Sequence, residues 1–198
     1  MSLRATYVRA PDRRAQDLID ACARALARHG AGGVSVRTIC ADAGVSPGLL
    51  RHYFEGIDDL VAATYAHVGA AVADALDAAV AAAGPDPRAR LAAYVNASFR
   101  PPIATQDLLS TWLAFWSLVK SDPAIAALHR DIYAGYRVAL EALLLDAGMA
   151  AADVGQAAIA ITALVDGLWL ELSLDAGVFG AEEAAAIAAR WLSVWLPE

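Results

Sequence analysis

The sequence predicts an all-α protein of about nine helices, and three observations support this fold class. Apolar residues recur with the three-to-four-residue period of a helix in every long segment, and no segment shows the alternation of a half-buried strand. Glycines and prolines lie where these segments stop or start. Alanine raises the mean hydropathy to +0.46, and we interpret this apolar excess as a tightly packed helical core and a dimer face.

The first three helices are expected to be short and close together. The glycines among residues 29–33 end the first helix because they tolerate positive φ. Ser35 and Ser46 are the expected N-cap residues of the second and third helices, and Pro47 fits the first position of the third. The expected ranges are 13–27, 36–43 and 47–54.

Six further helices are expected, and caps, prolines and glycines mark their ends. Asp86 and Asp122 each precede a proline, which is a typical helix start, and Thr105 is another expected N-cap. Asp153 is expected to open the eighth helix. The expected ranges are 58–83, 87–99, 106–121, 123–147, 153–176 and 181–196.

The charge is divided unevenly along the chain. Residues 1–55 hold eight arginines against five acidic residues, a net charge of +3, whereas the remaining residues carry −10; together they give the −7 of the whole chain. Such an asymmetry is expected when only one end of a protein meets a polyanion.

Several classes of protein are disfavoured. No charge-free apolar run approaches the ~18–20 residues of a membrane-spanning helix, and residues 1–4 begin no signal-peptide core. Cys22 and Cys40 match no metal-ligand spacing, and we interpret them as buried, reduced thiols. We therefore expect a cytoplasmic protein with no membrane association, no metal site and no cofactor.

Residues 35–54 have the organisation of a helix-turn-helix, in which a second short helix is held out for the major groove of DNA. Gly44 permits the left-handed turn between the helices. Helix N-termini and arginine suit phosphates, and an arginine or histidine on the presented helix can reach guanine. An ordinary helical hairpin with a solvated charged face is the alternative. The candidate DNA-binding residues on the outer face are Arg37, Thr38, Ser46, Pro47, Gly48, Arg51 and His52.

Residues 13–60 also resemble the N-terminal domain of the TetR family of transcriptional regulators. The resemblance is carried by Ser35, Val36, Ile39, Ala43, Gly44, Val45, Ser46, Gly48, His52, Tyr53, Phe54 and Leu60. It implies that the third helix reads the major groove and that Tyr53 contacts a phosphate. Two positions depart from the family pattern: Cys40 stands where alanine is usual, and Ile57 stands where a phosphate-contacting lysine is common.

The resemblance extends into the second half of the chain. Residues 112–116 followed by 122–124, and residues 166–170, are similar to the choline-responsive BetI-type branch of the same family. This similarity implies a helical domain that binds an effector and forms a dimer. We expect that domain at residues 57–198, after a helix-turn-helix domain at residues 1–56.

Six aromatic residues are candidates for the effector pocket. Two tryptophans lie one helical turn apart with a phenylalanine beside them, and aromatic residues of later helices could close around that face. Aromatic faces near Asp166 or Glu171 would suit an organic cation, with an attraction of up to about 2 kcal/mol when desolvated. An apolar effector, or a purely structural role in the core, is the alternative. The candidates are Trp112, Phe115, Trp116, Tyr133, Tyr136 and Trp169.

The last two helices carry apolar and small residues that predict a dimer interface. Pairing the same two helices from each chain would form an isologous four-helix interface. A two-fold homodimer would place two recognition helices in successive major grooves, as a palindromic operator in double-stranded DNA requires. The expected interface residues are Ile159, Ala163, Gly167, Leu170, Trp191 and Trp195.

Together these features favour a ligand-responsive, DNA-binding transcriptional regulator, expected to be a repressor that its effector releases from DNA. In this hypothesis the effector shifts the helix at residues 58–83 and changes the separation of the two recognition helices. The alternatives are an all-α small-molecule-binding protein or enzyme that uses the aromatic cavity, and a helical scaffold without a ligand. Against an enzyme, the chain has no metal-ligand spacing, phosphate-cradling glycine loop or nucleophile elbow.

Overall fold

The computed structural model describes residues 10–175 and 177–196, and these residues have the predicted all-α fold. They form nine α-helices and one turn of 3-10 helix, and they include no strand. In chain order the elements are α1 (Ala10–His29), η1 (Ala31–Gly33), α2 (Val36–Ala43), α3 (Pro47–Tyr53), α4 (Ile57–Ala82), α5 (Pro87–Ala97), α6 (Gln106–Leu118), α7 (Pro123–Asp146), α8 (Ala151–Leu174) and α9 (Ala181–Trp195).

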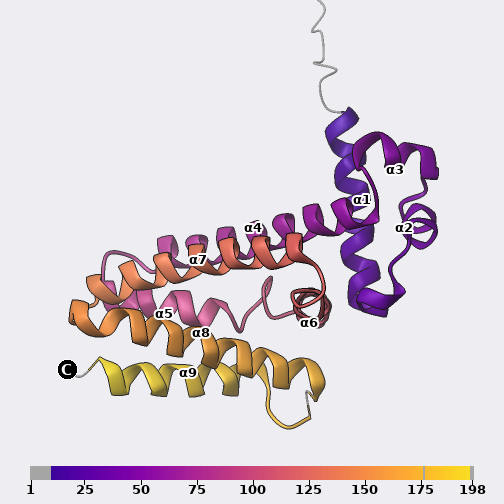
Figure 1. Ribbon diagram of the computed structural model, residues 1–198. Coiled ribbons are helices and arrows are strands. Elements are labelled where there is room, and N and C mark those ends of the chain that lie inside the picture. Colours follow the sequence, from indigo (N-terminus) through magenta and orange to yellow (C-terminus); the bar gives the residue numbers. More distant parts are fainter. Residues whose placement is uncertain (1–9, 176, 197–198) are drawn as a thin grey trace, which may run out of the picture.

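Helices α1, α2 and α3 form a small lobe at one end of the molecule, and α4 leads from this lobe into a larger bundle (Figure 1). Local hydrogen bonds set the ends of the short helices. The Ser35 hydroxyl accepts from the Thr38 N–H at 3.2 Å, and the Ser46 hydroxyl accepts from the Leu49 N–H at 3.3 Å. Gly44, between α2 and α3, has a φ of 66°, a left-handed conformation that glycine adopts without steric cost. The predicted helix-turn-helix is therefore present.

Buried apolar side chains fix α2 and α3 against α1. Leu18 and Cys22 of α1, Ile39 of α2 and Leu50 of α3 are each 0% exposed. Burial of an aliphatic side chain of this size contributes roughly 1.5–3 kcal/mol. Leu60 of α4 is equally buried, so the core of the lobe continues into the long helix.

The larger bundle consists of α4 to α9. Helix α4 packs against α5 and α7, α7 packs against α8, and α9 packs against α5 and α8. Helix α6 packs against both α8 and α1. Figure 1 shows α6 beside α1, where the bundle meets the lobe. Two helices, α4 and α6, therefore connect the bundle to the helix-turn-helix.

Some helix ends differ from the expected ranges by two or three residues. Helices α5 and α6 end early, at Ala97 and Leu118, because tight backbone turns begin there. Asp153 does not cap α8, which begins at Ala151. Its carboxylate lies instead in the first turn, where the positive end of the helix dipole favours an acid.

Helix α8 presents an apolar face that the single chain leaves uncovered. By length and composition it is the one helix among the described residues that could cross a membrane, and 28% of its most apolar stretch is buried within the chain. No membrane-spanning helix was expected because no long run lacks charged residues, and the apolar sequence of α8 does contain the charged residue Asp166. Ile159 and Leu174 are 62% and 66% exposed, so they lie outside the core of this chain.

Candidate functional site

The helix-turn-helix presents a polar and cationic surface. Arg37 of α2 and Arg51 of α3 are exposed, and neither makes an ion pair with another described residue. Their charges are therefore available to an approaching phosphate. Tyr53 is half-buried, with its ring edge-to-face against that of His52 at 4.9 Å. The other candidate DNA-binding residues are exposed: Thr38, Ser46, Pro47, Gly48 and His52.

Two arginines among residues 1–55, Arg24 and Arg28, share one carboxylate, that of Asp42, so the three side chains keep one net positive charge. The Nε of Arg24 donates to Oδ2 of Asp42 at 2.9 Å, and the Arg24 Nη2 lies 2.7 Å from the same oxygen. The Nη1 of Arg28 lies 3.7 Å from Oδ1 of Asp42. These contacts tie the end of α2 to α1. No local sequence pattern predicts these contacts, because they join residues of two different helices.

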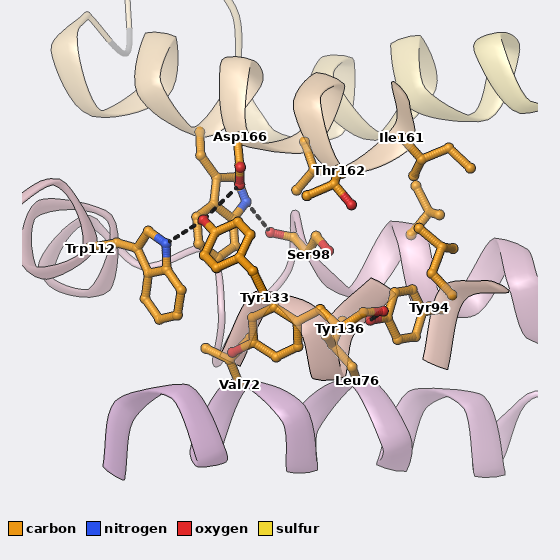
Figure 2. A pocket seen from close by; sticks show the side chains of 14 residues that line it. Val72, Leu76, Tyr94, Ser98, Trp112, Tyr133, Tyr136, Ile161, Thr162 and Asp166 are labelled. Carbon is orange, nitrogen blue, oxygen red and sulfur yellow. Dashed lines mark hydrogen bonds between the residues drawn. The ribbon is translucent and has the colours of Figure 1, made fainter. Parts of the chain in front are cut away.

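Helices α4, α5, α6, α7 and α8 line a cavity with about 50 Å³ of free space, so a small organic molecule enters it only by displacing lining side chains. Figure 2 shows aromatic side chains from several helices around it. Asp166 of α8 supplies the one carboxylate among the described lining residues. We call this space the aromatic cavity; its aromatic lining residues are Tyr94, Trp112, Tyr133, Tyr136 and Trp169.

The aromatic rings pack against one another from three helices. Trp112 lies edge-to-face with Trp169, with ring centres 5.7 Å apart and planes at 88°. Tyr136 lies 6.5 Å from Trp112 and 5.9 Å from Tyr133. Because ring faces carry the negative part of the aromatic quadrupole, such a lining attracts positive charge.

The hydroxyl of Tyr133 is the centre of a hydrogen-bond network on the cavity wall. It accepts from the indole Nε1 of Trp112 and from that of Trp116, each at 3.0 Å, and it donates to Oδ1 of Asp166 at 3.2 Å (Figure 2 shows the Trp112 and Asp166 bonds). The Nε1 of Trp169 donates to the Ser98 carbonyl at 2.8 Å. The indole N–H groups are thus satisfied within the protein, so ring faces and one carboxylate remain for a ligand.

Burial raises the pKa of Asp166 to about 6, and the hydrogen bond from Tyr133 opposes that rise. The carboxylate is therefore mostly ionised at neutral pH, although it lies in a largely apolar cavity. Asp166 is half-buried and makes no ion pair with another described residue, so its negative charge loses hydration without a cationic partner. A positively charged ligand would remove that cost.

Four of the six candidate pocket residues line the aromatic cavity: Trp112, Tyr133, Tyr136 and Trp169. The prediction for Phe115 is wrong: it is 0% exposed and its ring stacks on Tyr65 of α4 at 4.2 Å, so it belongs to the core. Trp116 lines a neighbouring cleft and reaches the cavity only through its bond to Tyr133. Tyr94 of α5 also lines the cavity and was not predicted, because no sequence pattern distinguishes it from a core tyrosine.

The described residues contain no group of three or more His, Cys, Asp or Glu side chains placed to hold a metal ion. Cys22 and Cys40 are buried and free. Burial raises the pKa of the Cys22 thiol to about 11, despite a hydrogen bond with Thr64 that lowers it. Neither thiol is exposed as a nucleophile, which fits the interpretation of both as structural core residues.

Comparison with known protein families assigns both halves of the chain. Residues 18–64 match the model described as bacterial regulatory proteins of the tetR family, and residues 87–197 match the C-terminal domain of BetI-type transcriptional repressors. The chain belongs to the TetR family. It is a transcriptional regulator with a BetI-type C-terminal domain, and this family is not one of enzymes.

Curated relatives and solved structures agree with this assignment. The chain is 33% identical over 192 residues to the HTH-type transcriptional regulator BetI of Burkholderia cenocepacia, covering 93% of this chain and 94% of that protein. It is 35% identical over 187 residues to BetI of Pseudomonas aeruginosa, covering 92% of each. The crystal structure of a transcriptional regulator from Pseudomonas aeruginosa PAO1 has a TM-score of 0.83 at 39% identity, covering 96% of this chain and 91% of that one.

A regulator from Saccharomonospora viridis, solved in complex with choline, shares the fold of this TetR-family regulator. Its TM-score is 0.78 at 21% identity, and the alignment covers 92% of this chain and 96% of that one. Proteins of the TetR family bind DNA operators and small-molecule effectors, and they typically form dimers.

Proposed function

We propose that this TetR-family regulator binds a small organic cation in the aromatic cavity, and that occupation of the cavity releases it from its operator. One observation carries the proposal: Asp166 places a half-buried carboxylate within an aromatic lining. A cation there would gain cation–π attraction and compensate the carboxylate. The choline complex of the Saccharomonospora viridis regulator supports a ligand of this class.

Contacts from the cavity wall to α1 and α4 connect ligand binding to the release of DNA. Thr111 precedes Trp112 on α6; its hydroxyl donates to the Asp107 carbonyl of the same helix at 2.7 Å and also lies 3.3 Å from the Ala23 carbonyl of α1. The hydroxyl of Tyr136 donates to the Gly69 carbonyl of α4 at 2.8 Å. A ligand that displaces Trp112 or Tyr136 therefore acts on both helices that reach the helix-turn-helix. A tenfold loss of DNA affinity needs only about 1.4 kcal/mol of differential binding.

On the DNA side, α3 would enter the major groove of double-stranded DNA with Arg51 reading a base edge. The N-terminus of α3 around Ser46 and the half-buried Tyr53 would contact phosphates. Ile57, at the start of α4, is uncharged, so it makes no ionic phosphate contact at that position. The proposed division into domains falls at this point, between residues 1–56 and 57–198.

A two-fold homodimer through α8 and α9 would cover the apolar surface that one chain leaves exposed. Exposed side chains on these helices include Ile159 at 62%, Ile187 at 46% and Val194 at 75%. Ala163 and Gly167 are small and exposed, which allows close approach of a second helix. Leu170 and Trp191 are half-buried, and the side chain of Trp195 lies outside the described residues. We place the dimer on palindromic operators in the cytoplasm.

Selection of bound duplexes from a random pool, followed by salt titration, tests the DNA proposal. Palindromic half-sites and binding that weakens steeply with salt are expected. Arg51→Ala should cost about 1–3 kcal/mol on the selected duplex if Arg51 reads a base. Arg130→Ala, an exposed arginine of α7, is the matched control and should change binding little. Equal affinities of the two variants for the selected duplex would show that Arg51 does not contact a base.

A further inference from the structure

A second hollow adjoins the aromatic cavity between α6, α7 and α8, and it has basic side chains that the aromatic cavity lacks. This outer cleft has a volume of about 560 Å³, and its basic lining residues are Lys120, His129 and Arg137. It shares Tyr133, Thr162 and Asp166 with the aromatic cavity. These three side chains therefore form a wall that the two spaces share.

The basic groups of the outer cleft lack acidic partners among the residues that the structure describes. Lys120 and Arg137 make no ion pair there. His129 is held at its Nδ1 by the hydroxyl of Tyr65, 2.8 Å away, and its ring lies 4.2 Å from that of Tyr133. Its pKa is lowered, first by burial and then by the nearby charge of Arg137.

We infer that the effector is a zwitterion, with an ammonium group in the aromatic cavity and an anionic group in the outer cleft. The inference rests on the proposed function and adds the second charge. The ring faces around Asp166 favour a cation in the aromatic cavity, whereas Arg137 and Lys120, which line the outer cleft and not the cavity, favour an anion there. Arginine is the residue best suited to bind a carboxylate or phosphate through two hydrogen bonds. The ligand must therefore bear both charges, joined by a spacer that passes Tyr133.

Titration calorimetry on the full-length chain with four probes tests this inference. Choline carries the cation alone, glycine betaine carries a carboxylate on a one-carbon spacer, and 4-(trimethylammonio)butanoate carries it on a three-carbon spacer. Phosphocholine replaces the carboxylate with a phosphate. We expect at least one of the two longer zwitterions to bind at least tenfold more tightly than choline, and the tighter of the two identifies the anionic group.

Variants of Arg137 show whether that preference arises in the outer cleft. Arg137→Gln should remove the tenfold preference without weakening choline binding, because it takes away a positive charge, whereas Arg137→Lys should keep part of the preference. Arg130→Gln, an exposed arginine on the same helix, is the matched control and should keep all of it. Circular dichroism shows that the variants are folded.

The outcomes separate this inference from the proposed function. Suppose that choline binds and that Asp166→Asn weakens choline binding, but that no zwitterion binds more tightly than choline. The proposed cation site is then supported and the zwitterion inference is wrong. A zwitterion preference that Arg137→Gln leaves intact also contradicts the inference, because the anion then binds elsewhere. If no ammonium probe binds, both proposals are wrong.

Discussion

The hydroxyl of Tyr133 donates to Oδ1 of Asp166 at 3.2 Å, and this hydrogen bond joins α7 to α8 across the wall of the aromatic cavity. The same hydroxyl accepts the indole N–H groups of Trp112 and Trp116 on α6. One phenol therefore orients the two tryptophans and the carboxylate that the proposed cation site requires.

Replacing Tyr133 by Phe should lower the free energy of unfolding by about 1–3 kcal/mol, because the N–H groups of Trp112 and Trp116 lose their acceptor in a buried region. Urea denaturation measures the change. Tyr53→Phe, at a half-buried position on α3, is the control, and it should change the same quantity by less than about 0.5 kcal/mol. Equal losses in the two variants would mean that the network does not stabilise the bundle.

Choline binding should weaken as the pH falls through about 6. Burial raises the pKa of Asp166 to about 6, so the carboxylate is ionised above that pH and protonated below it. Only the ionised form compensates the ligand charge. We expect the Kd from calorimetry to rise between pH 7.5 and pH 5. In Asp166→Asn the Kd should be higher at pH 7.5 and should change less with pH. This variant therefore distinguishes titration of Asp166 from titration of His129 as the cause of the pH dependence. A wild-type Kd that does not change with pH contradicts the assignment.

Two helical glycines should respond oppositely to alanine. A Cβ at Gly69 of α4 would lie 2.9 Å from Cδ1 and 3.2 Å from Cγ1 of Ile132 on α7, whereas a Cβ at Gly135 would meet nothing within 4 Å. Gly135→Ala should raise the free energy of unfolding by about 0.5–1 kcal/mol through helix propensity. Gly69→Ala should lower it or leave it unchanged, because α4 and α7 must separate.

A double-mutant cycle in urea checks the cause of that difference. In an Ile132→Ala background, which removes the crowding atoms, Gly69→Ala should become stabilising. A Gly69→Ala change that is as stabilising as Gly135→Ala in the wild-type background would show that the α4–α7 approach is not tight.

Much of the helix-turn-helix could be predicted from the sequence because its determinants are local. Ser35, Gly44 and Ser46 act on backbone groups within a few residues, so the turn and both caps follow from their positions. The second hydroxyl of the Ser35 capping box, that of Thr38, was predicted only as a DNA contact, yet it accepts from the Ser35 N–H at 3.0 Å.

The candidate site was only partly predictable because it depends on contacts between distant helices. The pattern of α6 placed Phe115 beside Trp112, but the choice between cavity and core depends on Tyr65 of α4, which stacks on Phe115. Likewise, the charge count could not show that Asp42 neutralises Arg24. Aromatic type and helical period predict which residues are buried, whereas the packing of α4, α6 and α7 decides which of them line a cavity.

Disrupting the exposed apolar face of α9 should dissociate the proposed dimer. Ile187→Asp places a charge at a position that is 46% exposed in the single chain and would be buried between two copies. Sedimentation at micromolar concentration should show a dimer for the wild type and a monomer for the variant. Val138→Asp, at a 66% exposed position on α7, is the control and should remain dimeric. A wild-type monomer of 20.6 kDa would contradict the dimer.

Release of DNA by a cation tests the central claim most directly. Fluorescence anisotropy of a selected duplex, titrated with choline at pH 7.5 and constant ionic strength, should show release from the wild-type protein. Asp166→Asn should bind the same duplex with unchanged affinity in the absence of choline and require a much higher choline concentration for release. Duplex binding by the wild type that choline and its zwitterionic analogues leave unchanged, or equal release from Asp166→Asn, would contradict the account.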